Sequence, residues 1–177
     1  MRRWIRELKA LGVCKEAIKW AKEKEKDYVS LQTAWRFCKR GDWMLWLAGK
    51  VSGPPESDSR KRLVLAACEC ARLSLRHVPK GEKRPLAAIE TAEAWARGER
   101  GVTLQDVRAA ADTAYDADAA YVPYVAYAAA YATHAAAAYA THAAYAAIYA
   151  ADAADARIET LAECAEIVRR HYPKVPV

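Results

Sequence analysis

Apolar and polar residues alternate with helical periodicity along most of the chain, and the most regular stretch runs from Ala109 to Ala156. Of its 48 residues, 26 are Ala and eight are Tyr. Ala is the strongest helix former, and neither Gly nor Pro interrupts the chain between Tyr124 and Tyr172. The pattern predicts an all-α fold, a multi-helix bundle with long Ala/Tyr-rich C-terminal helices and short Trp-rich N-terminal helices.

The large side chains of this stretch gather on one side of the predicted helix. At about 100° per residue, measured from Tyr121, they occupy the sector between about 220° and 300°. Tyr121 and Tyr139 lie at one margin of this stripe, and most of the remaining circumference is Ala. The stripe consists of Tyr124, Tyr127, Tyr131, His134, His142, Tyr145, Tyr149 and Asp152.

Two packing arrangements fit this stripe. Small Ala side chains let helix axes approach closely, so the Ala face can be the core and the stripe the solvent side. Alternatively, the Tyr rings are the core, because each ring buries a large area and its hydroxyl finds a partner. We expect a mixture, with most Tyr half-buried against other helices and tight contacts between Ala faces. A functional interpretation is that Tyr and His line a groove for a ligand.

The Ala-rich region is too long to be one straight helix in a compact domain. From Tyr124 to His171 it would span about 70 Å at 1.5 Å per residue. We therefore expect the chain to fold back, with Asp152 or Asp155 as the new N-cap. At the other end, Pro123 should restart or kink the helix.

Shorter helices precede this region. Thr103 and Asp106 form a capping-box pattern for the helix that enters it. Gly41 is expected to end an earlier helix and Asp42 to cap the next one. Residues 53–59 are rich in Pro and Ser and are predicted to be a linker. This divides the chain into N-terminal helices, 1–52, that dock on a main bundle, 60–177. The other expected helices span 3–10, 14–25, 30–39, 43–48, 60–77 and 85–97.

Charge is distributed unevenly along the chain. Residues 1–100 carry 23 Lys and Arg against 13 Asp and Glu, whereas residues 101–177 carry 5 against 9. The net charges are therefore +10 and −4, which indicates either packing of one half against the other or an anionic partner for the first half. Solvated helix faces explain the same pattern without a ligand. Lys80, Lys83 and Arg84 cluster in one predicted loop and are candidates for binding phosphates.

The sequence also bears on the cellular compartment. The region outside the Ala-rich stretch contains no apolar run of about 20 residues, and the start has no apolar segment typical of a signal peptide. The number of Cys is five, without a CxxC pair, which is typical of reduced, buried thiols. We expect a cytoplasmic protein that does not enter a membrane.

The patterns that carry catalysis or metal binding are not found in the sequence. It has no nucleophile–base motif and no Gly-rich phosphate loop. On one helix, His134 and His142 would lie two turns apart and about 80° apart, so they could not hold one ion together. We expect no catalytic residues, no metal and no cofactor.

Three blocks together resemble a known family. They are LAACECAR at 65–72, RPLAAIETAEAWARGE at 84–99, and the Ala-rich helices bearing His134 and His142. In these blocks the chain resembles the Ala-rich bacterial and phage proteins grouped as immunity proteins of polymorphic-toxin systems. The segment RGDWMLWL at 40–47 is similar to the N-terminal extension of the phage members. The resemblance covers residues 30–160 and implies a non-enzymatic inhibitor that binds a toxin, without catalytic residues.

The expected function is therefore that of a non-enzymatic helical binding protein of a bacterial host or its phage. It is immunity-like or anti-defence, and it neutralises or sequesters a partner protein, a toxin or a defence factor. Surfaces rich in Tyr and Trp suit such contacts. The alternatives are sequestration of a nucleotide-like anion by basic residues and Tyr rings, and nucleic-acid binding by the basic N-terminal half. The Ala-rich helices are also candidates for self-association.

Overall fold

The computed structural model describes residues 1–116, 123–137, 140–153 and 156–177, and within these the fold is all-α, as the sequence predicts. Tyr121, Tyr139 and Asp155 lie outside the described residues. The α-helices are α1 (Arg3–Leu11), α2 (Lys15–Glu23), α3 (Leu31–Phe37), α4 (Gly41–Val51), α5 (Asp58–Arg72), α6 (Arg84–Arg97), α7 (Leu104–Tyr115), α8 (Pro123–Ala137), α9 (Ala143–Ala153) and α10 (Arg157–His171).

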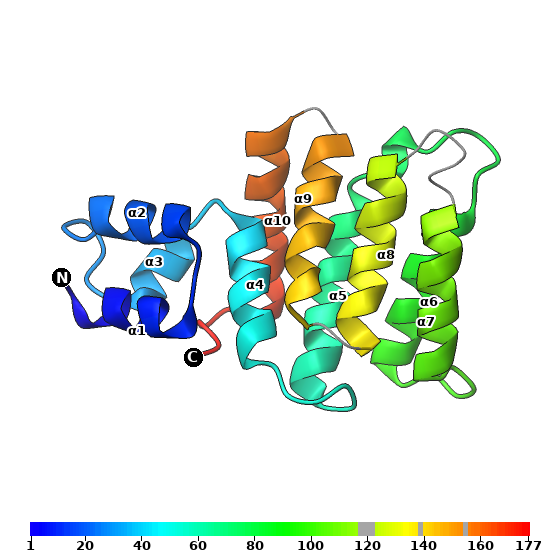
Figure 1. Ribbon diagram of the computed structural model, residues 1–177, viewed down its shortest axis with the longest axis horizontal. Coiled ribbons are helices and arrows are strands. Elements are labelled where there is room, and N and C mark those ends of the chain that lie inside the picture. The colour runs from blue at the N-terminus through cyan, green and yellow to red at the C-terminus, as the bar shows by residue number, and fades with distance from the viewer. Residues whose placement is uncertain (117–122, 138–139, 154–155) are drawn as a thin grey trace.

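The helices of the bundle form two layers. Neighbouring helices α4, α9, α8 and α7 make one layer, and α10, α5 and α6 pack against it as the second (Figure 1). α8 is central, because it packs on α5, α6, α7 and α9. α1, α2 and α3 lie together at one end of the molecule, next to α4 and the C-terminal tail (Figure 1).

Ala side chains fill the space between α8, α9 and their neighbours. A helix that is surrounded by others can approach them closely only where its side chains are small. The large Tyr and His side chains of α8 and α9 therefore project from the outer side of their layer. The buried Ala side chains are Ala128, Ala129, Ala130, Ala132, Ala135 and Ala136 of α8, and Ala143, Ala144, Ala146, Ala147, Ala150 and Ala151 of α9.

Most of the helix ends follow the signals in the sequence. α8 begins at Pro123, and α6 ends before Gly98, whose φ of 73° is left-handed. Thr103 and Asp106 form the expected capping box of α7. The prediction for Gly41 and Asp42, in contrast, is wrong: α4 begins at Gly41, and Asp42 does not cap it. Its carboxylate is buried in the first turn and accepts two hydrogen bonds from Arg40, which bind it more strongly than a backbone N–H would.

The Ala-rich region folds back twice, not once. α8 and α9 form one helical hairpin, and α10 returns after α9 (Figure 1). The sequence suggested that Asp152 caps the helix after the fold-back, but Asp152 does not cap α10. It lies inside α9 and forms an ion pair with Arg157, while the N-cap position belongs to Ala156, which makes no side-chain cap. The turn between α8 and α9 includes the short 3₁₀ segment Ala140–His142. Its sequence contains neither Gly nor Pro, the residues that most often mark the end of a helix, so this turn was not predicted.

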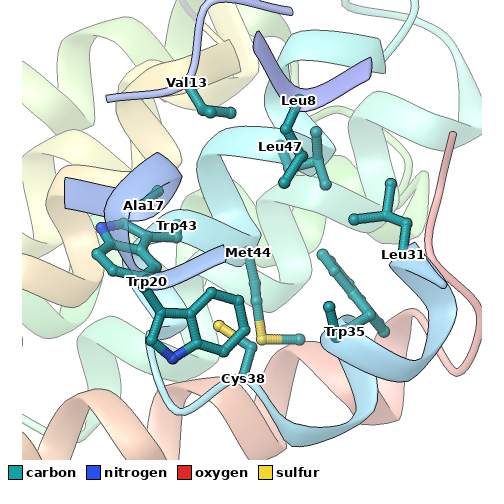
Figure 2. A pocket seen from close by; sticks show the side chains of 11 residues that line it. Leu8, Val13, Ala17, Trp20, Leu31, Trp35, Cys38, Trp43, Met44 and Leu47 are labelled. Carbon is teal, nitrogen blue, oxygen red and sulfur yellow. The ribbon is translucent and has the colours of Figure 1, made fainter. Parts of the chain in front are cut away.

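The N-terminal helices are held to the bundle by α4 and by the C-terminal tail. Trp35 donates its indole N–H to the carbonyl of Tyr172 over 2.9 Å, and Arg169 donates to the carbonyl of Cys38 over 2.7 Å. Figure 2 shows a small apolar cavity, about 50 Å³, between these helices and α4. Trp20 and Trp43 are among the side chains that line it. The division of the chain at residues 53–59 stays a prediction, and α4, which precedes it, packs within the bundle on α9 and α10.

α4 approaches the bundle most closely at two glycines. A Cβ on Gly49 would lie 2.6 Å from the carbonyl oxygen of Ala140, and a Cβ on Gly41 would lie 2.7 Å from the backbone nitrogen of Ala165. Both distances are shorter than a van der Waals contact, and both neighbours are backbone atoms, so neither can rotate away. These two positions set the distance between α4 and its neighbours.

We expect Gly49→Ala to lower the free energy of unfolding by about 1–3 kcal/mol, although Ala is the better helix former. The added methyl group forces α4 away from the turn after α8. Urea unfolding monitored by circular dichroism measures the change. The exposed neighbour Lys50→Ala is the control and should stay within about 0.5 kcal/mol of the parent. A stabilised Gly49→Ala variant would contradict the close approach.

Candidate functional site

A continuous layer of aromatic rings covers the outer side of α7, α8 and α9. We call it the aromatic face. It contains all seven Tyr and His residues that the sequence pattern proposed for binding, and one that it did not. Its members are Tyr115 of α7, Tyr124, Tyr127, Tyr131 and His134 of α8, His142 of the 3₁₀ segment, and Tyr145 and Tyr149 of α9.

Tyr131 is the centre of the aromatic face. Its ring lies 5.1 Å from that of Tyr145 and 5.3 Å from that of Tyr149, centroid to centroid, and it is nearly parallel to the second. Tyr115 approaches it edge-on at 5.9 Å from α7, and His142 approaches it edge-on at 5.3 Å. One ring of α8 thus connects α7 with α9.

The two ends of the aromatic face differ chemically. At one end, Tyr124 stacks on Tyr149 at 6.4 Å. At the other end, His134 and His142 lie 6.2 Å apart, and Tyr115 lies 5.5 Å from His134. The hairpin between α8 and α9 brings the two His together, whereas on one continuous helix they would lie two turns apart.

The aromatic face is partly accessible and uncharged near neutral pH. Tyr124 and Tyr145 are 48% and 45% exposed, and the other members are half-buried. Burial lowers the pKa of His134 and of His142, so both imidazoles are neutral at pH 7. Burial also raises the pKa of Tyr149, so its hydroxyl keeps its proton. The face therefore offers rings, hydroxyls and imidazoles to a ligand.

A groove of about 470 Å³ borders the aromatic face at Tyr145. It lies between α4, α9 and the turn that joins α1 to α2, and Trp43 and Trp46 form part of its wall. Its two guanidinium groups already have carboxylate partners. Arg40 forms a bidentate pair with Asp42, at 2.8 and 2.6 Å, and Arg157 pairs with Asp152 outside the groove lining. The groove is thus polar and aromatic, without an uncompensated cation.

The basic loop proposed from the sequence lies elsewhere, between α5 and α6. Arg84 donates to both carboxylate oxygens of Glu82, at 2.9 and 3.1 Å, and to the carbonyl of Asp116. This pairing with Arg84 lowers the pKa of Glu82 to about 2. Lys80 and Lys83 are exposed. Arg84 therefore fastens the loop to the end of α7, and the structure does not bring this loop together with the aromatic face.

Arg60, which belongs to the basic first half of the chain, has a structural role. It is buried and donates to the carbonyls of Gly53, at 2.9 Å, and of Ala135 in α8, at 3.2 Å.

Within the parts of the chain that the structure describes, no three His, Cys, Asp or Glu side chains come together as metal ligands. His134 and His142 supply two donors and lack a third of that kind in the described residues.

Tyr115 is the member of the aromatic face that sequence reasoning missed. At about 100° per residue from Tyr121 it falls near 120°, outside the stripe, because it belongs to a different helix, α7. Comparison of the chain with protein-family models, with curated proteins and with solved structures gives no match. The resemblance to immunity proteins thus stays a prediction. None of the described helices is long and apolar enough to cross a bilayer.

The two His should make stability depend on pH. Because burial lowers the pKa of His134 and His142 in the folded state, the unfolded chain binds more protons once the pH falls through about 6.5. Acidification from pH 7.5 to 5 should therefore lower the free energy of unfolding, and the decrease should be smaller in the His134→Gln/His142→Gln variant. Urea unfolding at both pH values measures this. The exposed His77→Gln is the control, and identical pH dependence of all three proteins would contradict the expectation.

Proposed function

We propose that the chain is a non-enzymatic binding protein whose aromatic face contacts a partner protein and thereby neutralises or sequesters it. The observation that carries this proposal is the continuous, uncharged layer of Tyr and His rings on α7, α8 and α9, with Tyr124 and Tyr145 nearly half exposed. Tyr is enriched at protein interfaces because it combines a large apolar ring with a hydroxyl that can donate and accept.

Rigidity supports this proposal. Each ring of the aromatic face packs against at least one other ring, and the helices that carry the rings are fixed by buried Ala. A side chain that is already ordered loses little conformational entropy when a partner covers it. Residues such as Tyr131, surrounded by other rings, are well suited to the centre of an interface, where a few residues contribute most of the binding energy.

The groove next to Tyr145 extends the same surface. Trp43 and Trp46 add aromatic area, and Arg40 lies over the ring of Trp43 at 4.1 Å. Because the guanidinium of Arg40 is neutralised by Asp42, the groove favours a protein segment with polar and apolar side chains. A nucleotide-like anion is the weaker alternative, since its phosphates would have to compete with these carboxylates.

The partner class follows from the resemblance to immunity proteins. We propose a toxin or a defence factor in the cytoplasm of a bacterial host, inhibited by being covered and not by being chemically modified. Inhibition by covering needs no reacting groups, only an extended complementary surface. The aromatic face and the adjoining groove together supply such a surface.

The test uses the two most exposed rings. We expect Tyr124→Ser/Tyr145→Ser to reduce partner recovery at least tenfold, because the variant loses accessible aromatic area while the half-buried rings stay in place. Immobilised parent and variant are compared in lysates of the cells from which the gene comes, with quantitative mass spectrometry. The recovered protein is then purified, and its affinity for each variant is measured by calorimetry.

The matched control replaces a more exposed apolar residue that is not part of the aromatic face. Ile158 on α10 is 77% exposed, and Ile158→Ser should recover the partner as the parent does. Equal recovery by all three proteins would contradict the proposed contact. Co-expression completes the test, because a partner that slows growth alone should do so less when the parent chain is present, and its effect should return with the Tyr variant.

A further inference from the structure

The positive charge of the protein is concentrated in its N-terminal helices. Residues 1–40 carry 12 Lys and Arg against 5 Asp and Glu, a net charge of +7. Residues 41–177 carry 16 against 17, a net charge of −1. The whole excess of cations thus lies on α1, α2, α3 and their connections, at one end of the molecule (Figure 1), whereas α7, α8 and α9 carry the aromatic face.

Four of these cations line one shallow hollow between α1 and α2, which we call the lysine hollow. Lys9 comes from α1, and Lys15, Lys19 and Lys22 come from α2. The hollow measures about 490 Å³, with Val13 and Ile18 in its floor and Glu23 as the carboxylate in its lining. All four Lys are exposed, and in the described part of the chain none of them has an ion-pair partner.

The positions of the lysines on α2 are regular. Lys15, Lys19 and Lys22 are spaced i, i+4 and i+7, so they follow one side of the helix at axial separations of about 6 and 4.5 Å. Ala17 and Ala21, on the opposite side, are buried. Like charges at this spacing repel each other in the free protein. A bound polyanion would offset this repulsion, because each ammonium group would be attracted to its negative charges.

Several other cations of the N-terminal segment are paired. Arg3 binds Glu7 at 2.7 Å, Lys24 binds Asp27 at 3.2 Å, and Arg40 binds Asp42 at 2.6 Å. In the lysine hollow, by contrast, four cations line one concavity, and none of them has an ion-pair partner among the described residues.

We propose that the lysine hollow binds nucleic acid through its phosphate backbone, independently of base sequence. Phosphates repeat along each strand about every 3.4 Å of helix axis, so a row of ammonium groups over about 10 Å can meet several of them. An anionic membrane fits less well. Membrane-binding surfaces expose large apolar side chains beside the cations, whereas Val13 and Ile18 are half-buried in the floor of a concavity.

The test measures binding of a fluorescein-labelled 20-base-pair DNA duplex by anisotropy between 50 and 200 mM NaCl. Four phosphate contacts predict a slope of about −3.6 for log K against log salt, or about 150-fold weaker binding over this range. We expect the variant with Lys9, Lys15, Lys19 and Lys22 all replaced by Gln to bind at least tenfold more weakly at 50 mM, with a slope close to zero.

The control removes four charges from the bundle instead, by Lys50→Gln, Arg100→Gln, Arg108→Gln and Lys174→Gln. All four residues are exposed, and the control should bind DNA within about threefold of the parent. Equal losses in both variants would overturn the proposal, since net charge alone would then explain binding. So would retention of the parent by phosphatidylserine vesicles but not by DNA. Tyr124→Ser/Tyr145→Ser should leave the DNA affinity unchanged, which separates this surface from the aromatic face.

Discussion

Close packing through Ala side chains is the constraint on which the rest of the structure depends. α8 packs on four other helices, and its described buried side chains are Ala except for Val125 and Thr133. Each buried Ala contributes little apolar area, so stability has to come from the number and closeness of such contacts. The glycines of α4 extend the same principle to a neighbouring helix, because atoms of the turn after α8 lie where a side chain of Gly49 would be, and atoms of α10 lie where a side chain of Gly41 would be.

This packing also explains why the aromatic rings lie where they do. An interior filled by Ala leaves no room for Tyr between the layers, so the rings remain on the outer side of α7, α8 and α9. There they pack on one another, which orders them without covering them. The half-buried environment then keeps the two imidazoles and the Tyr149 hydroxyl uncharged. The Ala-filled interior thus leads to an aromatic surface that is both ordered and neutral.

The molecule separates its two kinds of surface chemistry. The bundle carries neutral aromatic groups on one side and compensates most of its arginines with carboxylates, as Arg84 does with Glu82. The N-terminal helices carry the excess of positive charge, and the lysine hollow leaves it uncompensated in the described residues. α4 and the C-terminal tail connect the two parts through Trp35 and Arg169. The two contacts that we propose therefore rest on different side chains, aromatic rings in one and ammonium groups in the other.

The sequence by itself determined the helices, because Ala content, apolar periodicity and the signals at Pro123, Gly98 and Thr103 are local properties of the chain. It also identified the stripe of Tyr and His, since side-chain direction on a helix follows from spacing alone. Only the tertiary structure decided that the stripe is split between two antiparallel helices and that Tyr115 joins it from a third. The physical reason is that the sequence around the turn after α8 contains neither Gly nor Pro, so no single residue marks the end of the helix, and the reversal depends on the packing of α9 against α8, α4 and α5.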